Sequence, residues 1–283
     1  MKKSVKILSV LMCAVIAACC FTSLCFAAPG MNYVVLGDSI GYGAGISNPG
    51  EAVYGKIIAN TNSYNYSNFA QNGNETSDLL NKLRSNSSVI ESVKNADIIS
   101  ISIGGNNFLH ANMTDLMAKG MEGDFSEIER IVAGVRTDFD AIISKIKEYN
   151  SSAVILMQTL YNPLQDSDVG NVVYEKGTGM LNQVFKDYAA AHPGEIEIVD
   201  VAAAFKGKKG LISWDNIHPS AEGNYVIARA VQAKLYELGL ADTNEIVIKT
   251  KGLDWIPGGQ QTFVQKIIDF FTKLINFFKN LFR

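Results

Sequence analysis

The strongest constraint on the fold is the regular alternation of strand-like and helix-like segments between residues 32 and 240. Short runs of β-branched and aliphatic residues predict five strands, at residues 33–36, 65–69, 97–103, 153–158 and 195–201. Helical patterns lie between and after them, at residues 51–60, 76–94, 124–149, 171–191 and about 220–238. Because such an alternation forms a parallel sheet covered on both faces, we expect a three-layer α/β/α domain with a mostly five-stranded parallel sheet.

The N-terminal residues 1–27 predict a secretory signal peptide. Three lysines precede an apolar run at residues 7–18, and Ala27 ends a small-residue cleavage site. Cleavage there removes all four cysteines, so we expect neither disulfides nor cysteine-metal sites in a secreted, extracytoplasmic protein. Two alternatives remain open: lipidation of Cys19 in a lipoprotein-like box, and an uncleaved membrane anchor.

The C-terminal residues predict a separate amphipathic helix. Residues 243–262 include a cluster of glycine and proline that predicts a linker. In residues 263–283, paired apolar side chains recur at alternating spacings of three and four, which is typical of a helix, and the opposite face has a net charge of +3. Such a helix packs on the protein itself or lies on a membrane surface, and its six phenylalanines favour the membrane.

The charge distribution argues against a nucleic-acid partner. The chain has 25 basic and 28 acidic residues, and its first 260 residues contain no basic stripe. The three histidines are scattered along the chain, so we also expect no metal site.

Candidate catalytic residues follow the first strand and precede the last helix. Gly37-Asp38-Ser39 comes directly after the first strand, at a turn that can expose a serine hydroxyl above the sheet. Of the three histidines, only His218 has an acid three residues before it, namely Asp215. A tight turn of that length can bring a carboxylate and an imidazole together, which nucleophilic catalysis by a serine requires.

Two further polar groups follow the second and third strands. Gly73 can bring its backbone N–H close to a substrate because it has no side chain in the way. Asn106 offers a side-chain amide donor. Together with the N–H of Ser39, these groups could form an oxyanion hole with three donors. Each group taken singly is equally consistent with ordinary turn chemistry at a strand end.

The four motifs, in the order Ser, Gly, Asn, His, resemble the SGNH hydrolases, also called the GDSL esterase/lipase family. The matching segments are residues 37–39, 68–73, 104–107 and 215–218. The resemblance spans about residues 32–240 and implies an SGNH/flavodoxin-like catalytic domain over residues 28–242. One departure is Asn107, which stands where the family usually has Asp.

The resemblance implies a serine esterase or lipase that acts on a small-molecule or lipid ester without any cofactor. Ser39 would attack the ester carbonyl, His218 would carry the proton to the leaving alcohol, and Asp215 would orient the imidazole while an acyl-enzyme forms. The N–H groups of Ser39 and Gly73 and the amide of Asn106 would hold the oxyanion. Two alternatives remain: a carbohydrate O-deacetylase of the same fold, and a non-catalytic, surface-attached binding protein on an esterase fold.

Overall fold

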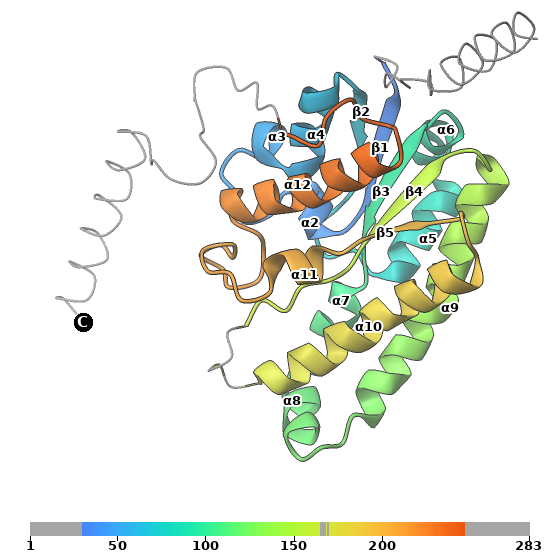
Figure 1. Cartoon of the computed structure of the whole chain (residues 1–283). Helices are drawn as coiled ribbons and strands as arrows, with labels where there is room; N and C mark the ends of the chain where they lie inside the picture. Colours follow the sequence, from blue (N-terminus) through green and yellow to red (C-terminus); the bar gives the residue numbers. More distant parts are fainter. Residues whose placement is uncertain (1–29, 165–167, 169, 247–283) are drawn as a thin grey trace, which may run out of the picture.

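The computed structural model describes residues 30–164, 168 and 170–246 (Figure 1). The five strands are β1 (Asn32–Gly37), β2 (Asn65–Asn68), β3 (Ile98–Ser102), β4 (Val154–Gln158) and β5 (Glu197–Val199). They form one parallel sheet in the order β2-β1-β3-β4-β5. The chain first adds β2 on one side of β1 and then adds β3, β4 and β5 on the other, so the winding reverses at β1. In open sheets of this kind, ligands bind at the carboxyl ends of the strands beside such a reversal.

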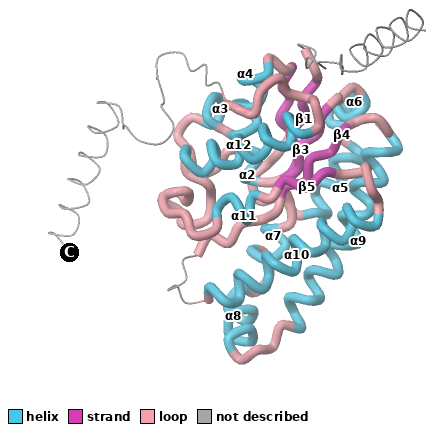
Figure 2. Tube along the Cα trace, viewed as in Figure 1, coloured by secondary structure: helices cyan, strands magenta, loops and turns pink. Residues whose placement is uncertain are grey.

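Helices cover both faces of the sheet, which confirms the predicted three-layer α/β/α fold (Figures 1 and 2). One face carries α3 (Pro49–Ala52), α4 (Tyr54–Asn62), α11 (Val201–Phe205) and α12 (Ala221–Glu237). The other face carries α5 (Thr76–Ser85), α6 (Ser87–Lys94), α9 (Ser126–Tyr149) and α10 (Asn171–Ala191). Three further helices begin near the carboxyl ends of the strands: α2 (Ser39–Tyr42), α7 (Gly105–Leu109) and α8 (Met113–Met121).

Alternate residues of the central strands contribute to two separate cores. In β1, Tyr33 and Val35 pack into the core beneath α4 and α12. Val34 and Leu36 pack into the core beneath α5, α9 and α10. This follows from the two-residue period of a strand, whose successive side chains point to opposite faces.

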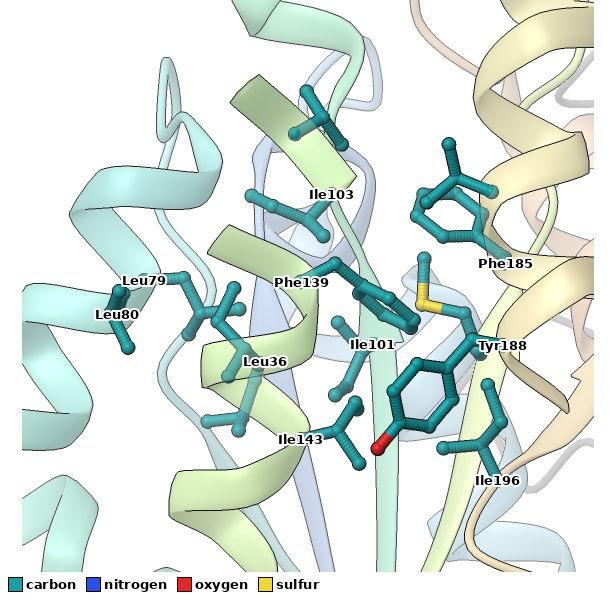
Figure 3. Close-up of a cluster of buried hydrophobic side chains, with 14 of the residues drawn as sticks. Leu36, Leu79, Leu80, Ile101, Ile103, Phe139, Ile143, Phe185, Tyr188 and Ile196 are labelled. Atoms are coloured by element: carbon teal, nitrogen blue, oxygen red, sulfur yellow. The ribbon is translucent and has the colours of Figure 1, made fainter. Parts of the chain in front are cut away.

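Aromatic rings join α9 and α10 above the sheet. The ring centroid of Phe139 lies 4.8 Å from that of Phe185 and 5.4 Å from that of Tyr188. Figure 3 shows Phe139 close to Ile101 of β3. Such aromatic pairs contribute about 0.5–1.5 kcal/mol each beyond simple burial. They hold α10, which forms one wall of the site described below.

Two of the predicted helices are interrupted, so these predictions are wrong in detail. The segment 76–94 divides into α5 and α6, because the side chain of Asn86 caps α6 by accepting hydrogen bonds from the N–H groups of Ser88 and Val89. The segment 51–60 divides at Val53, whose backbone is extended, into α3 and α4. The sequence pattern also does not predict α7, α8 and α11, since each is shorter than three turns and gives little periodic signal.

In the part of the chain that the structure describes, no helix has both the length and the apolar character needed to cross a membrane. The signal peptide predicted at residues 1–27, most of the linker predicted at 243–262 and the helix predicted at 263–283 lie outside the described residues. These assignments stay predictions.

Candidate active site

Ser39 is fixed at the carboxyl end of β1 by the turn that carries it. A Cβ atom on Gly37 would lie 1.9 Å from the carbonyl oxygen of Ser102, so only glycine permits this close approach of β1 to β3. The N–H of Asp38 donates to that same carbonyl at 2.9 Å. The carboxylate of Asp38 then caps α2 by accepting the N–H of Ile40 at 3.0 Å. Ser39 is the first residue of α2, and hydrogen bonds of the residues before and after it, Asp38 and Ile40, fix its position.

Asp38 is a buried carboxyl directly beneath this serine, and only 2% of it is exposed. Burial raises the pKa of Asp38 to about 6. Hydrogen bonds from Ile40 N–H and Ser102 Oγ, and the positive charge of the His218 ring in its protonated form, oppose this rise. The carboxylate is thus retained at neutral pH at a cost in stability.

Ser39, His218 and Asp215 form one continuous chain of hydrogen bonds. The Nε2 atom of His218 lies 2.8 Å from Ser39 Oγ, and its Nδ1 atom lies 2.6 Å from Asp215 Oδ2. The other carboxylate oxygen of Asp215 accepts the backbone N–H groups of Ile217 and His218, at 3.1 and 3.0 Å. In this arrangement an imidazole can remove the serine proton while a carboxylate holds the ring.

The electrostatics of Asp215 match that geometry. Burial alone would raise the pKa of Asp215, but hydrogen bonds from the His218 ring and from the N–H groups of His218 and Ile217 outweigh it and hold the pKa below its usual value. The carboxylate is therefore ionised at neutral pH and accepts a hydrogen bond from the Nδ1–H of the ring. Nε2 is left free to accept the hydroxyl proton of Ser39.

The turn that carries Asp215 and His218 is closed on itself and anchored to the domain. The N–H of Ser213 donates to the carbonyl of His218 at 2.8 Å, and Asn216 between them takes a left-handed backbone with φ of 62°. Ser213 Oγ donates to the carbonyl of Gly45 at 2.5 Å. A Cβ atom on Gly45, whose φ is 86°, would lie 2.8 Å from the Cβ atom of His218. The position of the imidazole thus depends on a glycine that the motif does not include.

The other two predicted groups, Asn106 and Gly73, lie differently with respect to the cavity beside Ser39. Asn106 is nearly buried and lines the same cavity as Ser39 and His218. Its Nδ2 atom donates one hydrogen to the carbonyl of Asn74 at 2.9 Å, which leaves the second hydrogen of the amide for a substrate oxygen. Gly73 precedes Asn74 and does not itself line the cavity.

Asn74 is a site residue that the sequence analysis misses. Its side chain is 4% exposed and donates to the carbonyl of Gly37 at 2.9 Å, while its own carbonyl accepts Asn106. Asn74 therefore joins the turns that follow β1, β2 and β3. The local sequence around Asn74 does not predict this role, because asparagine is common in loops simply for its turn-forming hydrogen bonds.

Asn107 contacts Thr76 at the start of α5, and through it α9, rather than the reacting groups. Its Oδ1 atom accepts the N–H of Thr76 at 3.2 Å, and its Nδ2 atom donates to Thr76 Oγ1 at 3.1 Å. The Thr76 hydroxyl in turn donates to Asp138 Oδ2 at 2.7 Å. An amide suits this position because it accepts and donates at once, which a carboxylate cannot do.

An apolar cavity opens beside Ser39 and His218. Including its open mouth, it amounts to about 810 Å³. Its apolar walls come from α7, α8, α9 and α10 and from the segment after β4, and they include Phe108, Met113, Leu116, Met117, Ile128, Leu160, Val173 and Leu181. At Gly177 of α10, a Cβ atom would lie 3.4 Å from the ring of Phe108, so the absence of a side chain there helps to keep the cavity open. The cavity suits an apolar chain attached to a group held at Ser39.

Within residues 30–164, 168 and 170–246, no cluster of three or more His, Cys, Asp or Glu side chains could hold a metal ion. The chemistry that the described site offers is that of Ser39, His218 and Asp215 together with hydrogen-bond donors.

Comparison with known proteins identifies the family of this fold. The profile of the GDSL-like Lipase/Acylhydrolase family matches residues 35–226, and the chain belongs to that family. This confirms the resemblance drawn from the four motifs and makes the chain an esterase/lipase-type hydrolase.

Individual relatives agree with this assignment. The chain is 28% identical over 216 residues to the spore germination lipase LipC of Bacillus licheniformis, covering 73% of this chain and 97% of the relative. Among solved structures, the lipase Lip_vut3 from a goat rumen metagenome is similar, with a TM-score of 0.62, 26% identity, and coverage of 72% of this chain and 96% of that one. A phospholipase A1 from Streptomyces albidoflavus NA297 shares the fold, with a TM-score of 0.57, 23% identity, and coverage of 73% and 100%.

Proposed function

We propose that this chain is a serine esterase or lipase that hydrolyses carboxylic esters through an acyl-enzyme on Ser39. The observation that carries the proposal is the unbroken hydrogen-bonded chain from Ser39 through His218 to Asp215, at the mouth of an apolar cavity. Family membership supports ester hydrolysis in general, and the geometry supports these three residues in particular.

The proposed reaction has two balanced halves. His218 Nε2 takes the proton of Ser39 Oγ as that oxygen bonds to the ester carbonyl carbon, and then gives the proton to the alcohol oxygen as the ester bond breaks. A water molecule attacks the resulting acyl-enzyme by the same route, with the proton passing to Ser39. Asp215 stabilises the imidazolium in both halves.

The negative oxygen that forms at the carbonyl needs hydrogen-bond donors. We assign this role to the backbone N–H groups of Ser39 and Gly73 and to the free hydrogen of the Asn106 amide. The assignment is supported by the fact that neither backbone N–H has a protein acceptor among the described residues, and by the engagement of only one hydrogen of the amide. A single donor of this kind typically stabilises the transition state by about 2.7–4 kcal/mol.

The walls of the cavity favour an extended acyl chain over a sugar acetate. An acetyl group would leave most of the space unfilled, and sugar hydroxyls placed against apolar walls would lose hydrogen bonds to water. A lipid or fatty acyl ester is therefore the proposed substrate, and carbohydrate O-deacetylation is the second candidate.

Secretion and membrane contact are proposed from the sequence alone. We propose that residues 1–27 are removed on export, that residues 28–242 form the catalytic domain, and that residues 263–283 contact a membrane surface. Mass spectrometry of the exported protein tests the first point: a chain that begins at Ala28 supports it, and a chain that begins at Met1 or at a lipidated Cys19 contradicts it.

Substitution of the three reacting residues tests the proposed mechanism. Ser39→Ala and His218→Ala should each remove nearly all hydrolysis of a p-nitrophenyl ester, because such a triad acts as a unit, and Asp215→Asn should retain more activity. His192→Ala is the matched control, since this imidazole stacks on Tyr188 at the end of α10, outside the site. Circular dichroism checks the fold of each variant.

Near wild-type turnover in His218→Ala would refute the assignment of the base. If wild-type enzyme bound esters without turnover and Ser39 never reacted with a fluorophosphonate, the chain would be a binding protein instead.

A series of acyl chain lengths tests the substrate. Wild-type kcat/KM should rise from acetyl to longer p-nitrophenyl esters, by at most about fourfold for each buried methylene. Gly177→Leu should reverse this trend by filling the cavity beside Phe108. Gly179→Leu is the control on the same helix, because no atom lies within 4 Å of a Cβ atom there. A wild-type preference for acetyl esters, strongest on acetylated sugars, would favour the deacetylase instead.

A further inference from the structure

The loop between α11 and α12 carries a group of cations that the proposed reaction does not use. Lys206, Lys208 and Lys209 are all exposed and lie within four consecutive positions. In the described part of the chain, none of these three ammonium groups takes part in an ion pair. Six other lysines and arginines there do so. Since the whole chain has a net charge of −3, this loop is a local positive region on an acidic protein.

The same loop presents a tryptophan to solvent. Trp214 is 86% exposed, more than any other large apolar side chain of the described residues. It stands one residue before Asp215, in the turn that is closed by the hydrogen bond from Ser213 to His218. The hydrogen bonds of this turn fix the backbone that carries Trp214, and the site itself requires the same turn.

The cations and the tryptophan belong to one anchored unit beside the cavity. The carbonyls of Gly210 and Leu211, which follow the lysines, accept hydrogen bonds from the hydroxyl and the N–H of Ser220, at 2.7 and 2.8 Å. Ile217, at the other end of the turn, is 37% exposed and lines the cavity mouth. Figure 1 shows this loop standing out at the left edge of the described domain, above the start of α10.

We propose that residues 206–217 form a docking surface for an anionic lipid surface. Lysine side chains are attracted to acidic headgroups, and an indole is most stable at the boundary between headgroups and acyl chains. Contact through Trp214 and Ile217 would place the cavity mouth against the lipid, so an acyl chain could enter without crossing water. Lipid docking at this surface is a function additional to ester hydrolysis at Ser39. The surface does not include residues 263–283.

Binding to vesicles tests the proposal in the full chain carrying Ser39→Ala, so that no lipid is hydrolysed. Sedimentation with vesicles of phosphatidylglycerol and phosphatidylcholine should be weakened about tenfold or more by Lys208→Ala/Lys209→Ala. The matched control is Arg84→Ala/Lys94→Ala, which changes the net charge equally on α5 and α6, over the other face of the sheet. The control should bind like the parent chain. Equal binding by the two double variants would overturn the proposal.

A spectroscopic measurement reports on Trp214 directly, whatever binding other segments contribute. The chain has two tryptophans, so W255F leaves Trp214 as the sole tryptophan, whose emission is excited selectively at about 295 nm. Its emission should shift to shorter wavelength on anionic vesicles and become protected from acrylamide. Vesicle binding without shift or protection would overturn the proposal. Equally tight binding to a soluble polyanion such as polyglutamate, again without a shift, would mark an acidic-polymer site and overturn it too.

Kinetics separate this proposal from the proposed function. With Ser39 intact, Lys208→Ala/Lys209→Ala should leave hydrolysis of a soluble short-chain ester unchanged and lower hydrolysis of an ester carried in anionic vesicles. An equal loss on both substrates would count against the docking surface. Absence of hydrolysis by the wild-type chain would refute the enzyme assignment alone, because the binding experiments do not depend on turnover.

Discussion

The buried carboxyl of Asp38 should make the stability of this protein fall as the pH rises. Its pKa is raised by burial to about 6, against an ordinary value of 3.8. A carboxyl with a raised pKa binds its proton more tightly in the folded state, so its stabilising contribution is present below about pH 4 and is lost as the pH rises through about 6. At about 1.36 kcal/mol per pKa unit, the loss is about 3 kcal/mol of unfolding free energy.

The substitution Asp38→Asn isolates this effect. An asparagine keeps an acceptor oxygen for Ile40 N–H and Ser102 Oγ but carries no charge. Urea unfolding at about pH 4 and about pH 7.5 gives the free energy of each protein, and the variant should gain about 2.4 kcal/mol relative to wild type between the two conditions. This is less than the full loss because the carboxyl of the unfolded chain is already partly ionised at about pH 4. The titrating groups that do not interact with Asp38 occur in the same surroundings in both proteins and cancel in this difference.

An exposed aspartate provides the control with the opposite sign. Hydrogen bonds from Gln183 and Arg136 lower the pKa of Asp187, so Asp187→Asn should lose stability relative to wild type as the pH rises through the acid range. If the difference in unfolding free energy between Asp38→Asn and wild type did not change with pH, burial would not destabilise the ionised carboxylate. That result would refute the raised pKa of Asp38.

Three further substitutions test other contacts of the site. Asn106→Ala should lower kcat by about 10²–10³-fold with KM nearly unchanged, and a rise in KM alone would make it a substrate-binding residue instead. Asn107→Asp should lower the thermal midpoint at neutral pH, because the single hydroxyl hydrogen of Thr76 would then face two carboxylates. Adding Asp138→Asn should restore it, and an unchanged midpoint in the single variant would contradict this. Gly45→Ala should lower kcat by displacing the neighbouring imidazole, and wild-type kcat would show that the turn tolerates the side chain.

The sequence predicts the fold and the reacting residues for the same physical reason. Parallel strands end at one edge of the sheet, so polar residues that follow β1, β2 and β3 must gather there. Ser39 and His218 are 179 positions apart, yet each stands at a turn that such a sheet brings to that edge. The Asp215 spacing adds a local signal, because three residues are enough for a closed turn.

Other features depend on contacts that leave no local pattern. Asn74 matters only because the carbonyl of Gly37 and the amide of Asn106 come within hydrogen-bond distance after folding. The apolar cavity depends on the packing of α7 and α8 against α10, and the two short helices give no periodic signal. The break at Asn86 was likewise decided by one cap, which outweighs the continuous apolar pattern of residues 76–94.

Rapid quenching of a reaction with a long-chain p-nitrophenyl ester, followed by mass spectrometry of the protein, tests the central claim most directly. A transient mass gain of one acyl group should appear during turnover, located on the peptide that contains Ser39 and absent from Ser39→Ala. Sustained hydrolysis with no acyl group on Ser39, or with the acyl group on another residue, would contradict it.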